Sequence, residues 1–226
     1  GKSVSLGDYY GMKESFVKNG TLATTKTKWT TRKEEDNPAM AYVHNLGSVS
    51  NSGKEGFMML GYDDIYSIEY MYEKRMGYWK HDGKVTIFDA FEKLRDNYQA
   101  IMERCRAFDE LIYDDAEKAG GKKYAEICSA SYRQVISAHK LFTDKEGNLL
   151  WFSKENNSNG CVNTVDLTYP SAPLFLVYNP ELQKAMMTSI FEYSASGRWN
   201  KPFPAHDLGT YPVSYTHLTL PTILRV

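Results

Sequence analysis

Cysteine is scarce in this chain, and a long apolar run is lacking. The three cysteines, Cys105, Cys128 and Cys161, have no C-x-x-C spacing, which argues against a zinc knuckle and against a disulfide framework. We expect Cys105 and Cys128 to be small core residues of helices. Because no apolar stretch reaches about 18 residues, the sequence does not predict a membrane-spanning helix.

An excess of charge of either sign is also lacking. Lys and Arg number 27, against 28 Asp and Glu. Such a balance creates no field that would attract nucleic acid or an anionic membrane, so neither is expected as a partner, and a neutral small molecule or glycan is favoured. The 17 tyrosines and 4 tryptophans are typical of proteins that handle sugars, and equally of aromatic cores and interfaces.

The first 62 residues differ in kind from the rest of the chain. Short β-prone pieces at residues 41–43 and 57–60 are separated by Gly, Asn and Ser turns, which predicts the end of a β domain over residues 1–62. The chain begins at Gly1 with neither an initiator Met nor a signal peptide. We therefore expect a piece of a longer protein, inactive alone, whose missing partner is the remainder of its own chain.

From residue 63 onward the apolar period lengthens to three or four residues. This period predicts a helix over residues 63–79, a long helix over 85–121 that ends at Gly120 and Gly121, and another over 123–142. Two helices joined by Gly-Gly form an antiparallel hairpin.

The C-terminal half alternates between strands, a loop and a further helix. Residues 141–154 predict two strands joined by a turn, and residues 179–196 predict a helix with Asn179 as its N-cap and Pro180 at its first position. Helical hairpins separated by such loops are the pattern of an α/α toroid, in which helix pairs surround a cavity and the loops at one end build the site. The predicted fold is mainly α with a β N-terminal part, and residues 63–212 form a partial (α/α)6 toroid.

Residues 151–180 contain too many turn formers for one helix or one strand. A long irregular segment in a compact domain is usually either disordered or a binding or catalytic loop. This segment is too aromatic and too poorly charged to be disordered, so we expect a functional loop.

An ordered set of motifs in the same region resembles the glutaminase A family. The family pattern consists of K-E-x-x-S-x-G, T-V-D-x-x-Y-P-x-x-P, N-P-x-L and H-D-L-G-x-Y-P segments. The chain matches it at Lys154, Glu155, Ser158, Gly160, Thr164, Val165, Asp166, Tyr169, Pro170, Pro173, Asn179, Pro180, Leu182, His206, Asp207, Leu208, Gly209, Tyr211 and Pro212. The resemblance covers most of residues 40–212.

The resemblance implies more about the fold than the residue pattern alone does. It implies that residues 1–62 are the end of a β-sandwich-type domain, that residues 63–212 are the first hairpins of a six-hairpin-glycosidase-like toroid, and that the parent protein is secreted or periplasmic. The family pattern stops after residue 212. Residues 213–226 have no helical period and are expected to be an artefactual tail.

Three carboxylates in the matching loops are the main catalytic candidates, with a histidine beside one of them. Glu155, Asp166 and Asp207 are brought to one rim by a toroid, and His206 adjoins Asp207. Glycoside hydrolysis needs two carboxyl groups, whereas amide hydrolysis needs an activated water, a proton donor for ammonia and donors to the oxyanion. This set can serve either reaction, with Glu155 as the first candidate for general acid or base.

Each of these residues also has a structural interpretation. Glu155 could form a salt bridge or cap a turn; Asp166, in an extended piece, could bond loop backbone and hold the Tyr169 turn. His206 and Asp207 could equally form a turn in which the Asp bonds backbone N–H groups.

The same loops supply the candidates for substrate binding, which are Trp151, Lys154, Asn156, Ser158, Tyr169 and Trp199, although aromatic side chains pack in cores more often than they line pockets. We expect no cofactor and no metal, because His44, His81 and His139 lack the spacing of metal ligands.

Three functions stay open at this point. The resemblance favours a hydrolase of the glutaminase A type, which would convert glutamine to glutamate and ammonia. The alternatives are a glycoside hydrolase with a carboxylate pair, and a toroid that binds a ligand without catalysis.

Overall fold

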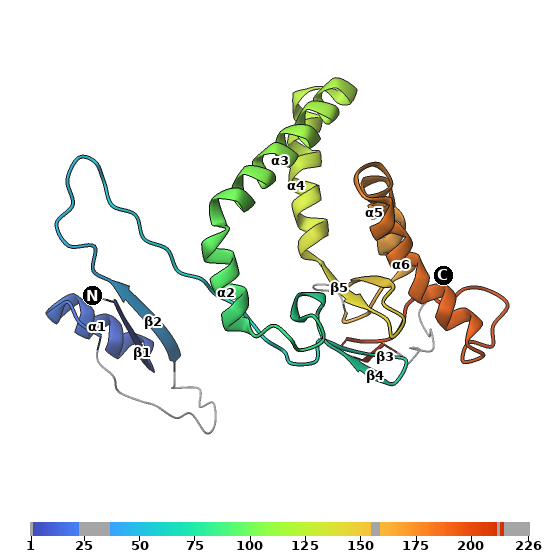
Figure 1. Cartoon of the computed structure of the whole chain (residues 1–226), viewed down its shortest axis with the longest axis horizontal. Coiled ribbons are helices and arrows are strands. Elements are labelled where there is room, and N and C mark those ends of the chain that lie inside the picture. The colour runs from blue at the N-terminus through green and yellow to red at the C-terminus, as the bar shows by residue number, and fades with distance from the viewer. Residues whose placement is uncertain (1, 23–36, 155–158, 212, 215–226) are drawn as a thin grey trace, which may run out of the picture. The chain divides into compact units, whose positions relative to one another are not determined.

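The computed structural model describes residues 2–22, 37–154, 159–211 and 213–214. The chain divides into two compact units, residues 1–60 and 61–226, and more of the described residues lie in helices than in strands (Figure 1).

The first unit consists of two antiparallel strands and one helix. Strands β1 (Lys2–Asp8) and β2 (Pro38–His44) pair antiparallel, and helix α1 (Tyr9–Asn19) follows β1 directly. The side chain of Asp8 accepts the Gly11 N–H at 2.8 Å and so caps the helix. Residues 57–60, which were predicted to be β-prone, form no strand.

The second unit contains the predicted helical hairpin. Helix α3 (Tyr98–Gly120) and helix α4 (Lys122–Ser137) run antiparallel, and Gly121 connects them with a φ of 79° that favours glycine. The rings of Phe108 and Tyr132 pack edge to face across the pair, 5.2 Å apart. The prediction of a hairpin at Gly-Gly is confirmed (Figure 1).

The predicted long helix over residues 85–121 is interrupted. Helix α2 (Ile87–Asp96) begins with a capping box in which Thr86 and Asp89 bond each other's backbone N–H groups. It ends at Asn97, whose side-chain and backbone N–H groups both donate to the carbonyl of Lys93, and α3 starts one residue later. Competition of an Asn side chain for a helix carbonyl is a common reason for such a break.

The second unit also contains a strand pair and a second helical hairpin. Strands β5 (His139–Thr143) and β6 (Leu149–Ser153) pair antiparallel, and the turn between them has Gly147 at φ 87°, as predicted. Helix α5 (Val165–Tyr178) is followed by helix α6 (Pro180–Ala195). The N-cap of α6 is Asn179, whose side chain accepts the Leu182 N–H, which confirms the predicted cap.

Strand β6 is covered on both of its faces. Leu150 and Phe152 lie in one apolar cluster with Ile190 of α6, and Trp151 lies in another with Phe175 of α5. The sequence of a strand that is buried on both faces is typically a continuous apolar run, and residues 149–152 of β6, "LLWF", form such a run.

The prediction of a helix over residues 63–79 is wrong. This segment forms strand β3 (Ile68–Tyr70), strand β4 (Glu73–Arg75) and the short 3-10 helix η1 (Tyr78–Lys80). Strand β7 (Val213–Ser214) pairs in parallel with β3. Ile68 and Tyr70 are two residues apart and both buried, so the strand period is the one that fills the core.

Three further expectations need correction. Residues 165–178 are helical, so the 151–180 segment is not one irregular loop, and Asp166 lies in the first turn of α5 instead of in an extended piece. Residues 139–142 belong to β5 instead of extending α4. Cys105 is exposed and only Cys161 is buried, so a core position for Cys105 is also wrong.

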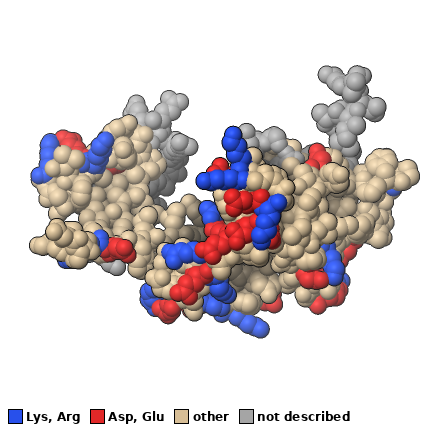
Figure 2. Space-filling view, turned by 90° about the horizontal axis from the view of Figure 1, so that it is seen from above, with Lys and Arg blue, Asp and Glu red and all other residues tan. Residues whose placement is uncertain are grey.

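Charged side chains of both signs are interspersed on the face shown in Figure 2. This view agrees with the near-zero net charge of the sequence, and it shows no broad region of one sign on that face. None of the described helices is both long enough and apolar enough to cross a lipid bilayer.

His139 is a partly buried histidine of the second unit, and it makes stability depend on pH. Its ring stacks on Trp151 at 5.0 Å and packs against Phe175 at 5.6 Å, while its Nδ1–H donates to the Val135 carbonyl at 2.6 Å. Burial lowers the pKa of His139 below 6.5. The unfolded chain therefore binds a proton more readily than the folded chain, and stability is full above pH 6.5 and decreases as the pH falls below it.

Replacement of His139 by Gln is expected to remove this part of the pH dependence. Urea midpoints measured from pH 6.5 down to about 5 test it, because the carboxylates of Asp63 and Asp64, whose ordinary pKa is 3.8, stay ionised there in both the folded and the unfolded chain. His81→Asn is the matched control: His81 is exposed at φ 45°, which Asn tolerates. An unchanged slope in His139→Gln would contradict the assignment.

Candidate active site

Two segments, residues 159–166 and 205–211, lie antiparallel beside strand β6 and carry three of the predicted catalytic residues. The first segment is a loop that runs into the first turn of α5. The Val162 N–H donates to the Gly209 carbonyl at 2.9 Å. On its other side, Val162 forms a β-bridge with Lys154, the residue that follows β6. The ladder thus fixes both loops to a buried strand.

His206 lies between two carboxylates. Its Nδ1 is 2.9 Å from Oδ2 of Asp207, and its Nε2 is 3.4 Å from Oδ1 of Asp166. The Asp207 side chain is only 4% exposed, and its other oxygen accepts the Gly209 N–H at 2.7 Å. Gly209 has a φ of 103°, so the turn that brings its N–H to Asp207 requires glycine. The His206 carbonyl accepts the Val165 N–H at 2.8 Å, which holds the start of α5 beside the imidazole.

This geometry defines which imidazole nitrogen is available for proton transfer. An ionised carboxylate only accepts hydrogen bonds, so Nδ1 carries the proton that Asp207 accepts. In the neutral ring, Nε2 is then the nitrogen that can accept a proton, and the side chain is 31% exposed. A histidine oriented by a buried carboxylate is suited to general acid–base chemistry.

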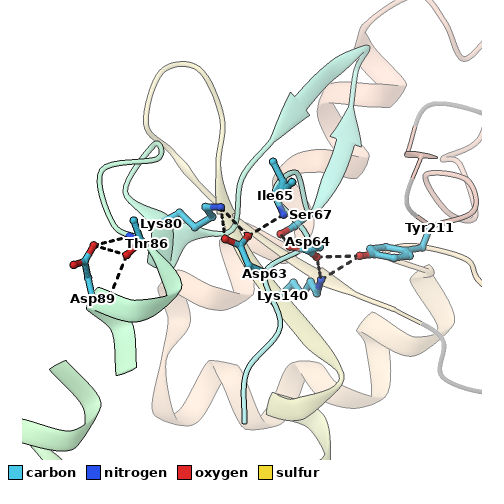
Figure 3. Close-up of polar contacts among 9 residues, drawn as sticks. All are labelled: Asp63, Asp64, Ile65, Ser67, Lys80, Thr86, Asp89, Lys140 and Tyr211. Carbon is cyan, nitrogen blue, oxygen red and sulfur yellow. Dashed lines mark hydrogen bonds and ion pairs between the residues drawn. The ribbon is translucent and has the colours of Figure 1, made fainter. Parts of the chain in front are cut away.

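A second polar network, centred on Asp64, joins three segments that are distant in sequence (Figure 3). Asp64 accepts hydrogen bonds from Ser67 Oγ at 2.5 Å, from Lys140 Nζ at 2.7 Å and from the Tyr211 hydroxyl at 3.4 Å. The ammonium groups of Lys140 and Lys154 lie 5.2 and 4.8 Å from the centre of the Tyr211 ring. Sequence analysis missed Asp64 and Lys140, and the only signal was Tyr211 in the H-D-L-G-x-Y-P motif.

The carboxylates of Asp63 and Asp64 are held ionised by lysines. Burial alone raises the pKa of Asp64, but hydrogen bonds from Lys140 and Ser67 outweigh it, so the pKa is lowered. The buried Lys80 donates to both oxygens of Asp63 at 2.7 and 2.9 Å, and this bond lowers the pKa of Asp63 (Figure 3). Both groups therefore position the segment that precedes β3 and do not donate protons at neutral pH.

The remaining predicted residues are not brought to His206. Trp151 is 7% exposed and lies in the core, stacked on His139. Tyr169 is 81% exposed on α5, and Trp199 packs against Tyr193 and Phe203 after α6. The Lys154 ammonium lies over the Tyr211 ring, and the Lys154 backbone bridges Val162.

Three of the predicted site residues, Glu155, Asn156 and Ser158, lie outside the described residues. Among the His, Cys, Asp and Glu side chains that the structure does describe, no group of three is arranged to hold a metal ion.

Two protein-family models match the chain, and together they cover most of its length. Residues 121–220 match the family model described as the glutaminase A six helical-hairpin domain, and residues 1–115 match a domain of unknown function, DUF5127. The second match covers half of the chain, and the first contains the whole His206 site. The chain belongs to the glutaminase A family.

Two relatives within the glutaminase A family come from Aspergillus oryzae and Arthroderma benhamiae. A protein of Aspergillus oryzae named glutaminase A is 32% identical over 223 residues, which is 96% of this chain and 32% of that protein. A protein of Arthroderma benhamiae named a probable glutaminase is 34% identical over 97 residues, which is 43% of this chain and 11% of that protein. The chain thus spans about a third of the length of the Aspergillus relative. No solved structure matches it.

Proposed function

We propose that this chain forms part of a hydrolase that cleaves a side-chain carboxamide and converts glutamine to glutamate and ammonia. The name of the Aspergillus relative, glutaminase A, supports the substrate class. The observation that carries the reaction is the orientation of His206, whose Nδ1–H is held by buried Asp207 while Nε2 faces exposed Asp166.

In the proposed reaction, His206 Nε2 removes a proton from water as the water oxygen attacks the amide carbon. The C–N bond then breaks, and the same proton passes from Nε2 to the departing nitrogen, so water and glutamine give glutamate and ammonia. Asp207 stabilises the imidazolium that forms between the two steps, and Asp166, 3.4 Å from Nε2, adds a second negative charge.

For the fold, we propose that the hairpins α3–α4 and α5–α6 are two members of an (α/α)6 toroid. The match to a six helical-hairpin domain supports this arrangement. The loops at one end of such a ring build its site, and the loops at residues 159–166 and 205–211 would then belong to that end.

A product assay separates the proposed function from its alternatives. The samples are this chain and a chimera in which it replaces the matching region of the Aspergillus relative. Ammonia released from L-glutamine, and lost on His206→Gln, supports the proposal. Release of reducing ends from glycans without ammonia would replace it by glycoside hydrolysis, and neither product would favour a toroid that only binds a ligand.

A further inference from the structure

A cavity of about 490 Å³ is lined by residues other than those of the His206 site. Strands β3 and β4, the turn between β5 and β6, and the C-terminal end of α6 contribute to it. Its volume falls within the range of about 300–1,000 Å³ that is typical of small-molecule pockets. Its lining is mainly charged, which distinguishes it from the apolar or aromatic surfaces that bind neutral ligands.

Most of the charges in this lining are already satisfied by protein groups. Arg75 is in ionic contact with Glu73, and Lys145 Nζ lies 3.7 Å from Glu146. Both oxygens of Asp144 accept hydrogen bonds from amide groups of the β5–β6 turn, at 2.7 Å each. The two ion pairs leave no net charge, whereas Asp144 keeps its negative charge, because amide donors do not neutralise a carboxylate.

Three charges of the lining have no ion-pair partner in the described part of the chain, namely the carboxylates of Asp144 and Glu192 and the guanidinium of Arg198. Glu192 accepts a hydrogen bond from the Tyr70 hydroxyl at 2.5 Å, and no cation pairs with it in the described part of the chain. The Arg198 guanidinium lies 4.4 Å from the centre of the Tyr72 ring and contacts Met71 Sδ at 3.1 Å, with no carboxylate partner among the residues described.

The Tyr70 hydroxyl supports this distribution of charge. Burial and the hydrogen bond to Glu192 raise the pKa of Tyr70, so its hydroxyl keeps its proton and donates it to the carboxylate. Donation by a neutral hydroxyl does not neutralise the charge of Glu192. A guanidinium on an aromatic face likewise keeps its N–H donors and its charge.

We propose that this cavity binds the zwitterionic head of a free α-amino acid, with the ligand ammonium on Glu192 and the ligand carboxylate on Arg198. A zwitterion places one charge of each sign close together, so that its carboxylate matches Arg198, the unpaired cation of the described lining, while its ammonium matches Glu192 in a lining to which Asp144 adds negative charge. Planar guanidinium groups pair well with carboxylates, and ammonium groups pair with carboxylates through charge-assisted hydrogen bonds. The site does not depend on the proposed glutaminase reaction.

Calorimetric titration of this chain with L-norvaline tests the site, because norvaline has the zwitterionic head but no amide to hydrolyse. One saturable site is expected. The methyl ester of norvaline, which lacks the carboxylate, and N-acetylnorvaline, which lacks the ammonium, should each bind at least about tenfold more weakly, because each loses one charge-assisted hydrogen bond. These ligand controls need no protein variant.

Protein variants then test whether Glu192 and Arg198 are the residues that bind the charged groups of the ligand. Glu192→Gln and Arg198→Gln are each expected to weaken norvaline binding at least about tenfold, whereas Lys145→Gln, which alters a cation of the same cavity that already has a partner, should change it by less than about threefold. His206→Gln should leave binding unchanged. The proposal would be overturned by absence of norvaline binding, by a methyl ester or N-acetylnorvaline that binds as tightly as norvaline, or by equal effects of Arg198→Gln and Lys145→Gln.

Discussion

Replacement of Asp207 by Asn is expected to lower the rate of ammonia release about a thousandfold. The Asn oxygen can still accept the Gly209 N–H, but its amide nitrogen donates to His206 Nδ1 where the carboxylate accepted. The imidazole is then driven to the other tautomer, with its proton on Nε2, and loses the lone pair that takes a proton from water. The measurement is kcat/KM for ammonia release from L-glutamine by whichever of the chain and the chimera is active.

A double variant separates this effect from a loss of folding. If His206 and Asp207 act as one unit, Asp207→Asn adds little to the loss caused by His206→Gln. Asp109→Asn is a matched control, because Asp109 forms an exposed ion pair with Arg133 on the α3–α4 hairpin and touches neither residue. Full activity in correctly folded Asp207→Asn, or multiplicative losses in the double variant, would contradict the proposed role.

The His206–Asp207 pair could be predicted from sequence because all of its parts are local. His206, Asp207 and Gly209 stand within four residues of one another, and the glycine permits the turn that brings its N–H to the carboxylate. Asp166 was predicted to share the same rim from the resemblance, and the structure places it 3.4 Å from His206. The network of Asp64, Lys140 and Tyr211 has no such local signal, since its members are 71 to 147 positions apart.

The wrong prediction of a helix over residues 63–79 is explained by backbone conformations that leave little trace in the sequence. Apolar residues spaced three or four apart over residues 63–79 imitate a helix, but Met71 and Tyr72 both have positive φ, 52° and 68°, and reverse the chain between β3 and β4. Side chains with a Cβ adopt this region rarely, so neither residue indicates a turn.

The opposite error, a helix taken for a loop, occurred at residues 165–178. Pro170 and Pro173 lie inside α5, although proline removes a helix hydrogen bond donor and was therefore taken as evidence against a helix. Ser171 Oγ donates to the carbonyls of Leu167 and Thr168 at 3.0 Å, and the buried Phe175 anchors the helix against β6. Tertiary packing thus outweighs local propensity in this segment.

Replacement of Phe152 by Ala is expected to lower the free energy of unfolding of the second unit by about 3–5 kcal/mol. Phe152 is 2% exposed, and its ring centre lies 5.4 Å from that of Tyr70 and 5.5 Å from that of Phe142, so truncation leaves a cavity between β3, β5 and β6. Domains of this kind are stable by about 5–15 kcal/mol, so the loss is a large share of the total. Urea unfolding followed by circular dichroism measures it.

Phe88→Ala is the matched control for Phe152→Ala, because it removes the same atoms from a side chain that is 74% exposed on α2. Its cost should stay within about 0.5 kcal/mol. Phe152→Leu, which keeps most of the apolar volume, should fall between the two. Equal costs for Phe152→Ala and Phe88→Ala would show that Phe152 is not a core residue. Phe152 directly precedes Ser153 and Lys154, which join β6 and the residue after it to residues 162 and 163, so a large cost would also show that the strand beside the His206 site belongs to the cooperative core of the unit.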